Sequence, residues 1–270
     1  MKLTTLDLTP RIGTEIRTDR GTLCSGVHAQ AIRDLLEQRG VLVFRGLGLS
    51  DDEQLAFSKT LGEIIPQGDK GLYKITLDEK AHDTVDLLYG TFCWHIDGTC
   101  DDIPTRASIL NPRRLSETGG QTEFANTYAA YEDLSTSDKR AIEKLRVVHM
   151  QETLQRHVFP NPTGGQLRRW RSRPTKTHPL VWTHRSGRKS LVLGMTATSV
   201  EGMTSAEGRA LIDRLQAWAS QPQYVYRHEW KIGDLLIWDN TGVMHRVQPY
   251  PADSGRMLQR TTLVGEEALV

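Results

Sequence analysis

Apolar residues recur along this chain with two different spacings, which predict helices in some stretches and strands in others. Between residues 25 and 39, isoleucine and leucine recur at helical spacing, so we expect a helix that begins at Ser25 and ends before Gly40. The apolar run that follows, VLVFRG at 41–46, predicts a buried strand. The first elements of the fold are therefore expected to be a helix and a buried strand.

Two further helix starts are marked by serine or threonine followed three residues later by glutamate, a spacing that lets the two residues cap the helix together. Ser50 and Glu53 predict one such helix. Thr204 and Glu207 predict another, whose leucines, isoleucine and tryptophan lie on one side. Residues 127–145 contain two shorter helical patterns.

Strand patterns dominate the last third of the chain. Residues 224–230 and 256–266 alternate, and 235–240 form a mostly apolar run. Residues 62–92 are rich in glycine and charge, and predict a loop with short strands. Because these elements do not follow βαβ units, they predict an α+β fold around an antiparallel sandwich or jelly roll. No repeat or linker divides residues 1–270, so we expect a single domain.

The stretch QRHVFPNPTGGQLRRWRSRPTK, at 155–176, is the main irregular insertion that the sequence predicts. It contains three prolines, two glycines and a cluster of arginines. A long loop inside a compact domain is often a lid or a disordered segment. Two interpretations stay open: a mobile lid whose charge attracts an acid, or a solvated loop.

Composition narrows the class of protein. Apolar residues make up 38% of the 270 residues and charged residues 25%, and the formal net charge is +1. This balance gives no indication of a nucleic-acid or membrane partner. Three cysteines without a CxxC spacing favour a reducing cytoplasm over a disulfide framework. The N-terminal stretch lacks the apolar core of a signal peptide, and no apolar run approaches the roughly 20 residues of a membrane span.

A histidine and an aspartate stand two positions apart in YGTFCWHIDGTC, residues 89–100. On a strand, His95 and Asp97 would project to the same side and offer two adjacent metal ligands. His245, 150 positions later in WDNTGVMHRVQPY, completes the two-histidine, one-carboxylate set of non-haem Fe(II) oxygenases. On these three residues alone, a His95–Asp97 hydrogen bond without metal is the simpler interpretation, because HxD is common by chance and the chain has nine histidines.

Two arginines that follow His245 change this balance. Arg256 and Arg260 lie eleven and fifteen residues after it, and residues four apart on a strand share a face. A guanidinium forms a planar bidentate pair with a carboxylate, which is what binding the far end of 2-oxoglutarate requires. Two solvated surface arginines remain the alternative.

At this point the chain resembles the Fe(II)/2-oxoglutarate-dependent dioxygenases of the taurine and chlorophenoxyacetate type. The resemblance runs over nearly the whole length, in the expected order. It is carried by LTPRIGTEI near the start, RGVLVFRGLGLSDDEQLAFSKTLGEI at 39–64, WHIDGT at 94–99, GGQTEFANTYAAYEDLS at 119–135, THPLVWTHRSGRKSLVLG at 177–194, GDLLIWDNTGVMHRV at 233–247 and RMLQRTTLVGE at 256–266. The implied fold is a double-stranded β-helix, a jelly roll with helices packed outside.

The resemblance also implies roles for single residues. It assigns three ligands to Fe(II): His95, Asp97 and His245. Arg256 and Thr122 would bind the distal carboxylate of 2-oxoglutarate, and Arg260 the anionic group of the primary substrate. Asn240 is a candidate hydrogen-bond partner for His245. Trp94 and Trp238 are either walls of the site or ordinary core residues.

The implied reaction is hydroxylation of an unactivated C–H bond by O2 in a small, anionic organic substrate, with release of succinate and CO2. The stretch LGEIIPQGDK lacks the substrate histidine of taurine-specific members, which argues against recognition of a sulfonate in their way. Asp97 stands where halogenating relatives carry glycine or alanine, so oxygen insertion is expected. Family resemblance loosely implies a dimer or tetramer.

Three alternatives are kept. The first is a hydroxylase of a larger natural product, such as a terpenoid or polyketide. The second is a nucleic-acid demethylase, whose paired arginines are six apart rather than four. The third is a cupin-like binding protein that has lost the chemistry.

Overall fold

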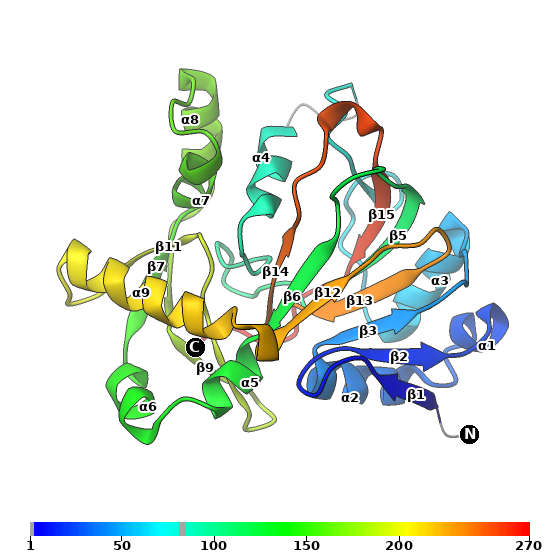
Figure 1. Ribbon diagram of the computed structural model, residues 1–270, viewed down its shortest axis with the longest axis horizontal. Coiled ribbons are helices and arrows are strands. Elements are labelled where there is room, and N and C mark those ends of the chain that lie inside the picture. The colour runs from blue at the N-terminus through cyan, green and yellow to red at the C-terminus, as the bar shows by residue number, and fades with distance from the viewer. Residues whose placement is uncertain (1–2, 81–84) are drawn as a thin grey trace.

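The computed structural model describes residues 3–80 and 85–270 (Figure 1). Within these residues, the largest sheet has seven strands in the order β1 (Thr4–Asp7), β2 (Thr14–Arg17), β3 (Val41–Phe44), β13 (Leu235–Asp239), β5 (Ala107–Arg114), β15 (Met257–Thr262) and β4 (Tyr73–Ile75). A second sheet has the order β12 (Val225–His228), β6 (Thr122–Asn126) and β14 (Val243–Val247). Side chains from both sheets meet in one apolar core. The fold is the expected jelly roll with helices outside.

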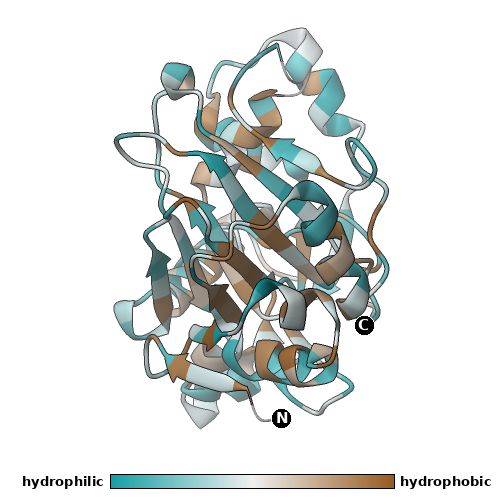
Figure 2. Cartoon of the chain, turned by 90° about the vertical axis from the view of Figure 1, so that its right-hand side faces the viewer, coloured by the Kyte–Doolittle hydropathy of each residue, from teal (hydrophilic) through white to brown (hydrophobic). Residues whose placement is uncertain are grey.

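Alternation along the strands decides which side chains enter that core. In β13, Leu236 and Trp238 face the interior between the two sheets. Leu235 and Ile237 face the other way and pack against two helices, α2 (Ala29–Arg39) and α3 (Asp51–Leu61). Figure 2 shows apolar residues gathered in the central strands, with hydrophilic residues over the outer loops. The nearly continuous apolar run that predicted this strand therefore serves two cores, one on each face.

A third layer packs on the outer face of the small sheet. It contains the strands β11 (Ala197–Val200), β7 (Arg146–His149) and β8 (Lys176–Pro179), and the pair β10 (Lys189–Leu191) and β9 (Val181–Thr183). The helices α5 (Thr127–Glu132) and α9 (Ser205–Ala219) share its apolar core. Helix α6 (Thr136–Ile142) follows α5, so the two short helices expected in 127–145 are confirmed.

The predicted caps have mixed outcomes. Both capping boxes are present, and they begin α3 and α9. The predicted helix start at Ser25 is wrong, because the Ser25 hydroxyl donates back to the Thr22 carbonyl. A short helix, α1 (Arg20–Cys24), ends there, and α2 begins four residues later. The end of α2 at Gly40 is confirmed, where the glycine N–H donates to the Leu36 carbonyl.

Residues 62–92 were expected to form a loop with short strands, and β4 confirms a short strand there. The expectation missed two helical segments, α4 (Val85–Tyr89) and η1 (Gly90–Phe92). Residues 81–84 of this stretch lie outside the described residues. Two further single-turn segments are η2 (Pro222–Tyr224) and η3 (Ala252–Ser254). In the described part of the chain, no helix is long and apolar enough to cross a membrane.

The prediction of an irregular insertion at 155–176 is wrong. The stretch is largely helical, with the end of α7 (Gln151–Val158) and all of α8 (Gly164–Arg171). A capping box between Thr163 and Gln166 begins α8 in spite of the two glycines that follow. On α4, one carboxylate oxygen of Asp86 accepts hydrogen bonds from Arg169 and from the Trp170 indole, both at 2.9 Å. Composition predicted a loop, whereas capping and this contact favour two helices.

Candidate metal and co-substrate site

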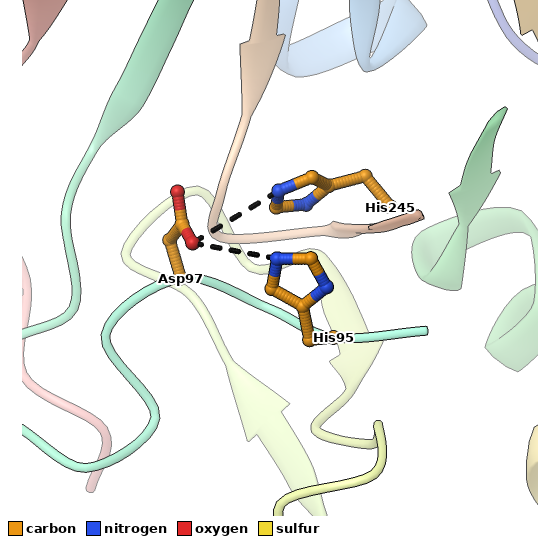
Figure 3. Close-up of side chains that lie close together, drawn as sticks. All are labelled: His95, Asp97 and His245. Carbon is orange, nitrogen blue, oxygen red and sulfur yellow. Dashed lines mark ion pairs between the residues drawn. The ribbon is translucent and has the colours of Figure 1, made fainter. Parts of the chain in front are cut away.

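The two histidines of the candidate site are placed together by the backbone. His95 and His245 form an isolated antiparallel bridge, with N···O distances of 3.0 and 2.8 Å. Asp97 follows at a turn, not on the strand that the spacing predicted, and Gly98 continues that turn with φ +86°. One ligand atom from each of the three side chains lies within 4.8 Å of the others (Figure 3). The structure thus brings together residues from distant parts of the chain.

The protonation states at this cluster suit a divalent metal ion. His95 Nδ1 lies 2.8 Å from the Cys93 carbonyl and must donate to it, which leaves Nε2 facing Asp97. Burial holds the pKa of His245 well below its usual value, so this imidazole is neutral. Burial acts to raise the pKa of Asp97, but the groups around the carboxylate, among them the Arg260 guanidinium and the Ser108 hydroxyl, together outweigh burial, and the pKa lies below its ordinary value. Neutral imidazole and ionised carboxylate are the forms that bind metal.

The two oxygens of Asp97 have different neighbours. Oδ1 faces the imidazoles, 3.7 Å from His95 Nε2 and 3.9 Å from His245 Nε2. Oδ2 lies 3.5 Å from both the Ser108 hydroxyl and Arg260 Nη1. One oxygen is therefore available to a metal ion while the other is contacted from behind.

A cleft of about 510 Å³ opens beside this cluster. His95, Asp97 and Arg260 lie in its wall, and Arg260 also sits 5.3 Å above the Tyr73 ring. Aliphatic side chains supply the apolar part of the lining, and they come from α4, from α7 and from the position between His95 and Asp97: Leu87, Leu88, Leu154 and Ile96. A cleft of this size and mixed character suits a small molecule.

The arginines of α8 and the residues after it divide into two groups. Arg169 pairs with Asp86 at 2.9 Å, and Arg171 pairs with Glu152 at 2.6 Å. Arg173 instead lines the cleft. In the described residues it has no ion pair within 4.0 Å, and its exposed side chain leaves the charge available to a molecule in the cleft.

Arg256 carries a buried charge that lacks an anionic partner. Its side chain is 2% exposed, and Nη2 donates to the Gly120 carbonyl at 2.9 Å. Nε and Nη1 are buried without a hydrogen-bond partner among the described residues. Gly120 makes room for this guanidinium, since a Cβ there would lie 2.7 Å from Arg256 Nε at a φ of +77°. A buried, half-satisfied cation fits an anionic ligand such as the distal carboxylate of 2-oxoglutarate.

Thr122 is also buried, and it accepts a hydrogen bond from the Trp230 indole at 2.9 Å. Its own hydroxyl hydrogen has no acceptor in the described part of the chain, so it is free to donate to an anion. Trp230 lines a cavity of about 200 Å³ together with Arg256 and Gly120. The residues present therefore fit both a divalent metal ion and an anionic co-substrate.

Sequence reasoning missed Trp230 and Ser108 and misplaced Asn240. Asn240 makes no hydrogen bond to His245; it contacts Ser108 and Trp238 instead. The alternation of β12 continued to residue 230 would have turned the Trp230 side chain inward, but its partner depends on sheet register. Trp238 belongs to the apolar core between the two sheets and packs against His245, with the ring centroids 4.7 Å apart. Trp94 lies under the Arg246 guanidinium, within the apolar core.

Comparison with known proteins gives consistent results. The family described as "Taurine catabolism dioxygenase TauD, TfdA family" matches residues 4–262. The chain is 33% identical to the alpha-ketoglutarate-dependent 2,4-dichlorophenoxyacetate dioxygenase of Burkholderia sp. (strain RASC), over 92% of this chain and 91% of the relative. It is also 33% identical to the alkylsulfatase of Acinetobacter baylyi, over 97% and 84%. The crystal structure of AAD-2 with Mn(II) and N-oxalylglycine superposes over the full length of both chains, with a TM-score of 0.86 and 30% identity.

Proposed function

Because the chain belongs to the taurine catabolism dioxygenase TauD, TfdA family, we propose that three converging side chains bind Fe(II): His95, Asp97 and His245. The protein is a 2-oxoglutarate-dependent dioxygenase, and it uses Fe(II), 2-oxoglutarate and O2. When bound, Fe(II) would activate O2, and O2 is the oxidant both for hydroxylation of a C–H bond and for conversion of 2-oxoglutarate to succinate and CO2.

The chain's own residues bind and orient the reactants. We assign Arg256 and Thr122 to the distal carboxylate of 2-oxoglutarate. The two unpaired buried nitrogens of Arg256, judged among the described residues, support this assignment, as does the free hydroxyl hydrogen of Thr122. Donors fixed in place before binding lose little freedom when the anion arrives.

We further propose that the primary substrate is a small organic anion whose charged group pairs with Arg260. The observation that carries this proposal is that Arg260 lines the same cleft as His95 and Asp97. Its Nε is buried without a hydrogen-bond partner in the described residues, and its contact with Asp97, at 3.5 Å, is long for a charged hydrogen bond. Two relatives are named for an aryloxyacetate and for alkyl sulfates, which supports an anion.

The experiment compares anions with a neutral molecule of the same shape. Succinate formation is measured with a panel of carboxylates and alkyl sulfates that includes 2,4-dichlorophenoxyacetate, and with the neutral 2,4-dichlorophenoxyacetamide. We expect stimulation by members of the anionic set, and loss of this preference in Arg260→Gln. Hydroxylation of the carbon that carries the ether oxygen gives a hemiacetal that releases the phenol, which is a second readout.

The outcomes separate the alternatives. Equal turnover of the acid and its amide would show that Arg260 does not select the substrate. Stimulation by neutral polycycles alone would favour the alternative, a hydroxylase of a larger natural product such as a terpenoid or polyketide. Family membership sets aside a cupin-like binding protein without activity.

We infer that residues 1–270 form one catalytic domain, with 155–176 acting as a lid over the cleft, since Arg173 lines its wall. A cytoplasmic location is supported by the three free cysteines. A small molecule is the expected partner, with no nucleic acid or membrane. Light scattering after size-exclusion chromatography tests for a dimer or tetramer.

A further inference from the structure

Asn240 uses its whole side-chain amide to join two groups beside the metal ligands. It is fully buried and follows directly after β13. Its Oδ1 accepts from the Trp238 indole at 2.6 Å, and its Nδ2 donates to the hydroxyls of Thr105 at 2.9 Å and Ser108 at 3.1 Å. An indole N–H can only donate, so the amide oxygen must face Trp238 and the NH2 group must face the hydroxyls. The orientation of the amide is therefore determined.

Through Trp238, Asn240 acts on His245. The indole ring lies 4.7 Å from the imidazole, centroid to centroid, and Phe124 contacts both rings. His245 Nδ1 has no hydrogen-bond partner within residues 3–80 and 85–270, whereas metal-bound histidines usually have one. Packing therefore takes the place of a hydrogen bond in orienting the ring, and the bond to Asn240 fixes the indole that does the packing.

Through Ser108, Asn240 acts on Asp97. The amide NH2 group occupies an acceptor position on the Ser108 oxygen, so the hydroxyl hydrogen is directed elsewhere. Asp97 Oδ2 lies 3.5 Å away and is the acceptor on that side. At this distance the hydroxyl lies behind Oδ2, where it limits rotation of the carboxylate and keeps Oδ1 turned toward the two imidazoles.

We propose that Asn240 is a positioning residue of the metal centre, which sets the orientation of His245 through Trp238 and of Asp97 through Ser108. One buried amide thereby couples two of the three ligands. The proposal rests on the proposed function, in which these side chains bind Fe(II).

The test measures metal binding without turnover. Co(II) is titrated into the purified full-length chain by calorimetry in the absence of 2-oxoglutarate, and the melting temperature of the metal-free protein is recorded separately. Asn240→Ala removes the hydrogen bonds to both Trp238 and Ser108. Ser108→Ala removes only the connection to Asp97. Asn240→Asp keeps the acceptor for the Trp238 indole and loses the N–H donors to the hydroxyls. We expect each variant to raise the Co(II) dissociation constant by roughly tenfold or more.

Asn111 provides the matched control. It is another buried asparagine, and its Nδ2 donates to the Leu49 carbonyl at 2.9 Å. On β5 it has the same parity as Ile109, which packs on the helix side, and so it points away from the site. Asn111→Ala should lower the melting temperature of the metal-free protein and leave Co(II) binding unchanged. A double variant adds a second criterion, because Ser108→Ala should cost less Co(II) affinity in the Asn240→Ala background than alone.

The outcomes distinguish this proposal from the proposed function. Wild-type affinity for Co(II) in Asn240→Ala, Asn240→Asp and Ser108→Ala, with a lowered melting temperature, would overturn the positioning role and leave the metal site intact. If the losses of Co(II) affinity in the two single variants multiplied in the double variant, Asn240 and Ser108 would act independently. That result would overturn the proposal that Asn240 acts on Asp97 through Ser108. The metal site itself, and this proposal with it, would be refuted by either of two results. The first is that the wild type binds no Co(II), and the second is that His95→Ala binds Co(II) as tightly as the wild type. Should Asn240→Ala not fold, the other two variants decide.

Discussion

Replacing Arg256 by methionine separates co-substrate binding from the stability of the fold. In the described part of the chain, this buried guanidinium donates to the Gly120 carbonyl, contacts the Tyr250 side chain and has no carboxylate partner. Burial lowers its pKa, and contact with Tyr250 opposes the shift. A cation that has lost its hydration without gaining an anion destabilises the free protein. The same unpaired donors would stabilise bound 2-oxoglutarate.

The two effects have different sizes. Removing the buried charge stabilises the free protein by roughly 1–4 kcal/mol. Losing the bond to Gly120 and the contact with the Tyr250 ring, 4.6 Å away, costs about 2 kcal/mol together. The free energy of unfolding should therefore change by between about −1 and +2 kcal/mol. Loss of a charged, two-bond contact should cost about 3–4 kcal/mol of binding, which raises the dissociation constant of 2-oxoglutarate by roughly 100- to 1,000-fold.

Thermal unfolding with Mn(II) measures both quantities. At a 2-oxoglutarate concentration of about 100 times the wild-type dissociation constant, the wild type gains about 2.7 kcal/mol, or about 5–10 °C. At that concentration Arg256→Met should gain less than about 2 °C, and without 2-oxoglutarate its melting temperature should lie no more than about 4 °C below that of the wild type. Arg114→Met is the control, because it removes an exposed arginine at the end of β5. Melting more than about 4 °C below the wild type, together with a full 2-oxoglutarate shift, would refute the reasoning and make Arg256 a structural residue.

Three further predictions concern single side chains. Trp230→Phe removes the donor to Thr122, so the dissociation constant of 2-oxoglutarate should rise roughly twofold to tenfold in an anaerobic titration of the Fe(II) chelate absorbance; unchanged affinity would contradict a positioning role. Arg173→Ala should raise KM for an anionic substrate several-fold. Arg168→Ala is the control, because it removes the same charge from an exposed side chain outside the cleft lining, and it should leave KM unchanged. Equal effects of the two variants on KM would point to general electrostatic attraction. Burial lowers the pKa of His149 to about 3. Since the unfolded state takes up a proton below about pH 6.5, this residue removes up to about 1.4 kcal/mol of stability per pH unit between pH 6.5 and 3. His149→Gln should therefore show a shallower loss of stability in urea unfolding as the pH falls through that range, and an unchanged slope would contradict the prediction.

Helix ends were predictable where both partners of a cap lie within three residues. Ser50 and Glu53 have no closer partners and bond each other, as their spacing indicates. The helix start predicted at Ser25 was wrong because a serine hydroxyl can either cap the helix that follows or donate to the carbonyl three residues earlier. The sequence does not decide between these two partners. The prediction of an irregular loop at 155–176 was wrong for a related reason. Its prolines and glycines lie at the ends of α7 and α8, where they delimit the helices.

The candidate ligands were predictable because HxD, a distant histidine and two spaced arginines are features of the chain itself. The residues that hold them were not, since these depend on which strands pair. Ser108 lies opposite Trp238 in the pairing of β5 with β13, and the strand that ends just before Trp230 pairs with β6, which carries Thr122. Alternation shows which face a side chain takes, but it does not show which strand becomes the neighbour.

The three candidate metal ligands differ in what fixes their positions. His245 lies in β14, and His95 is joined to it by two backbone hydrogen bonds, so the main chain places both imidazoles. Asp97 lies two residues further on, in a turn, and no backbone hydrogen bond of its own is found among the described residues. Its direction depends on side chains of the large sheet, Ser108 and Arg260. Substitutions in that sheet should therefore disturb the carboxylate before they disturb the histidines. If Arg260 turns toward a bound anionic substrate, the contact from Ser108 is the one left to hold Oδ2.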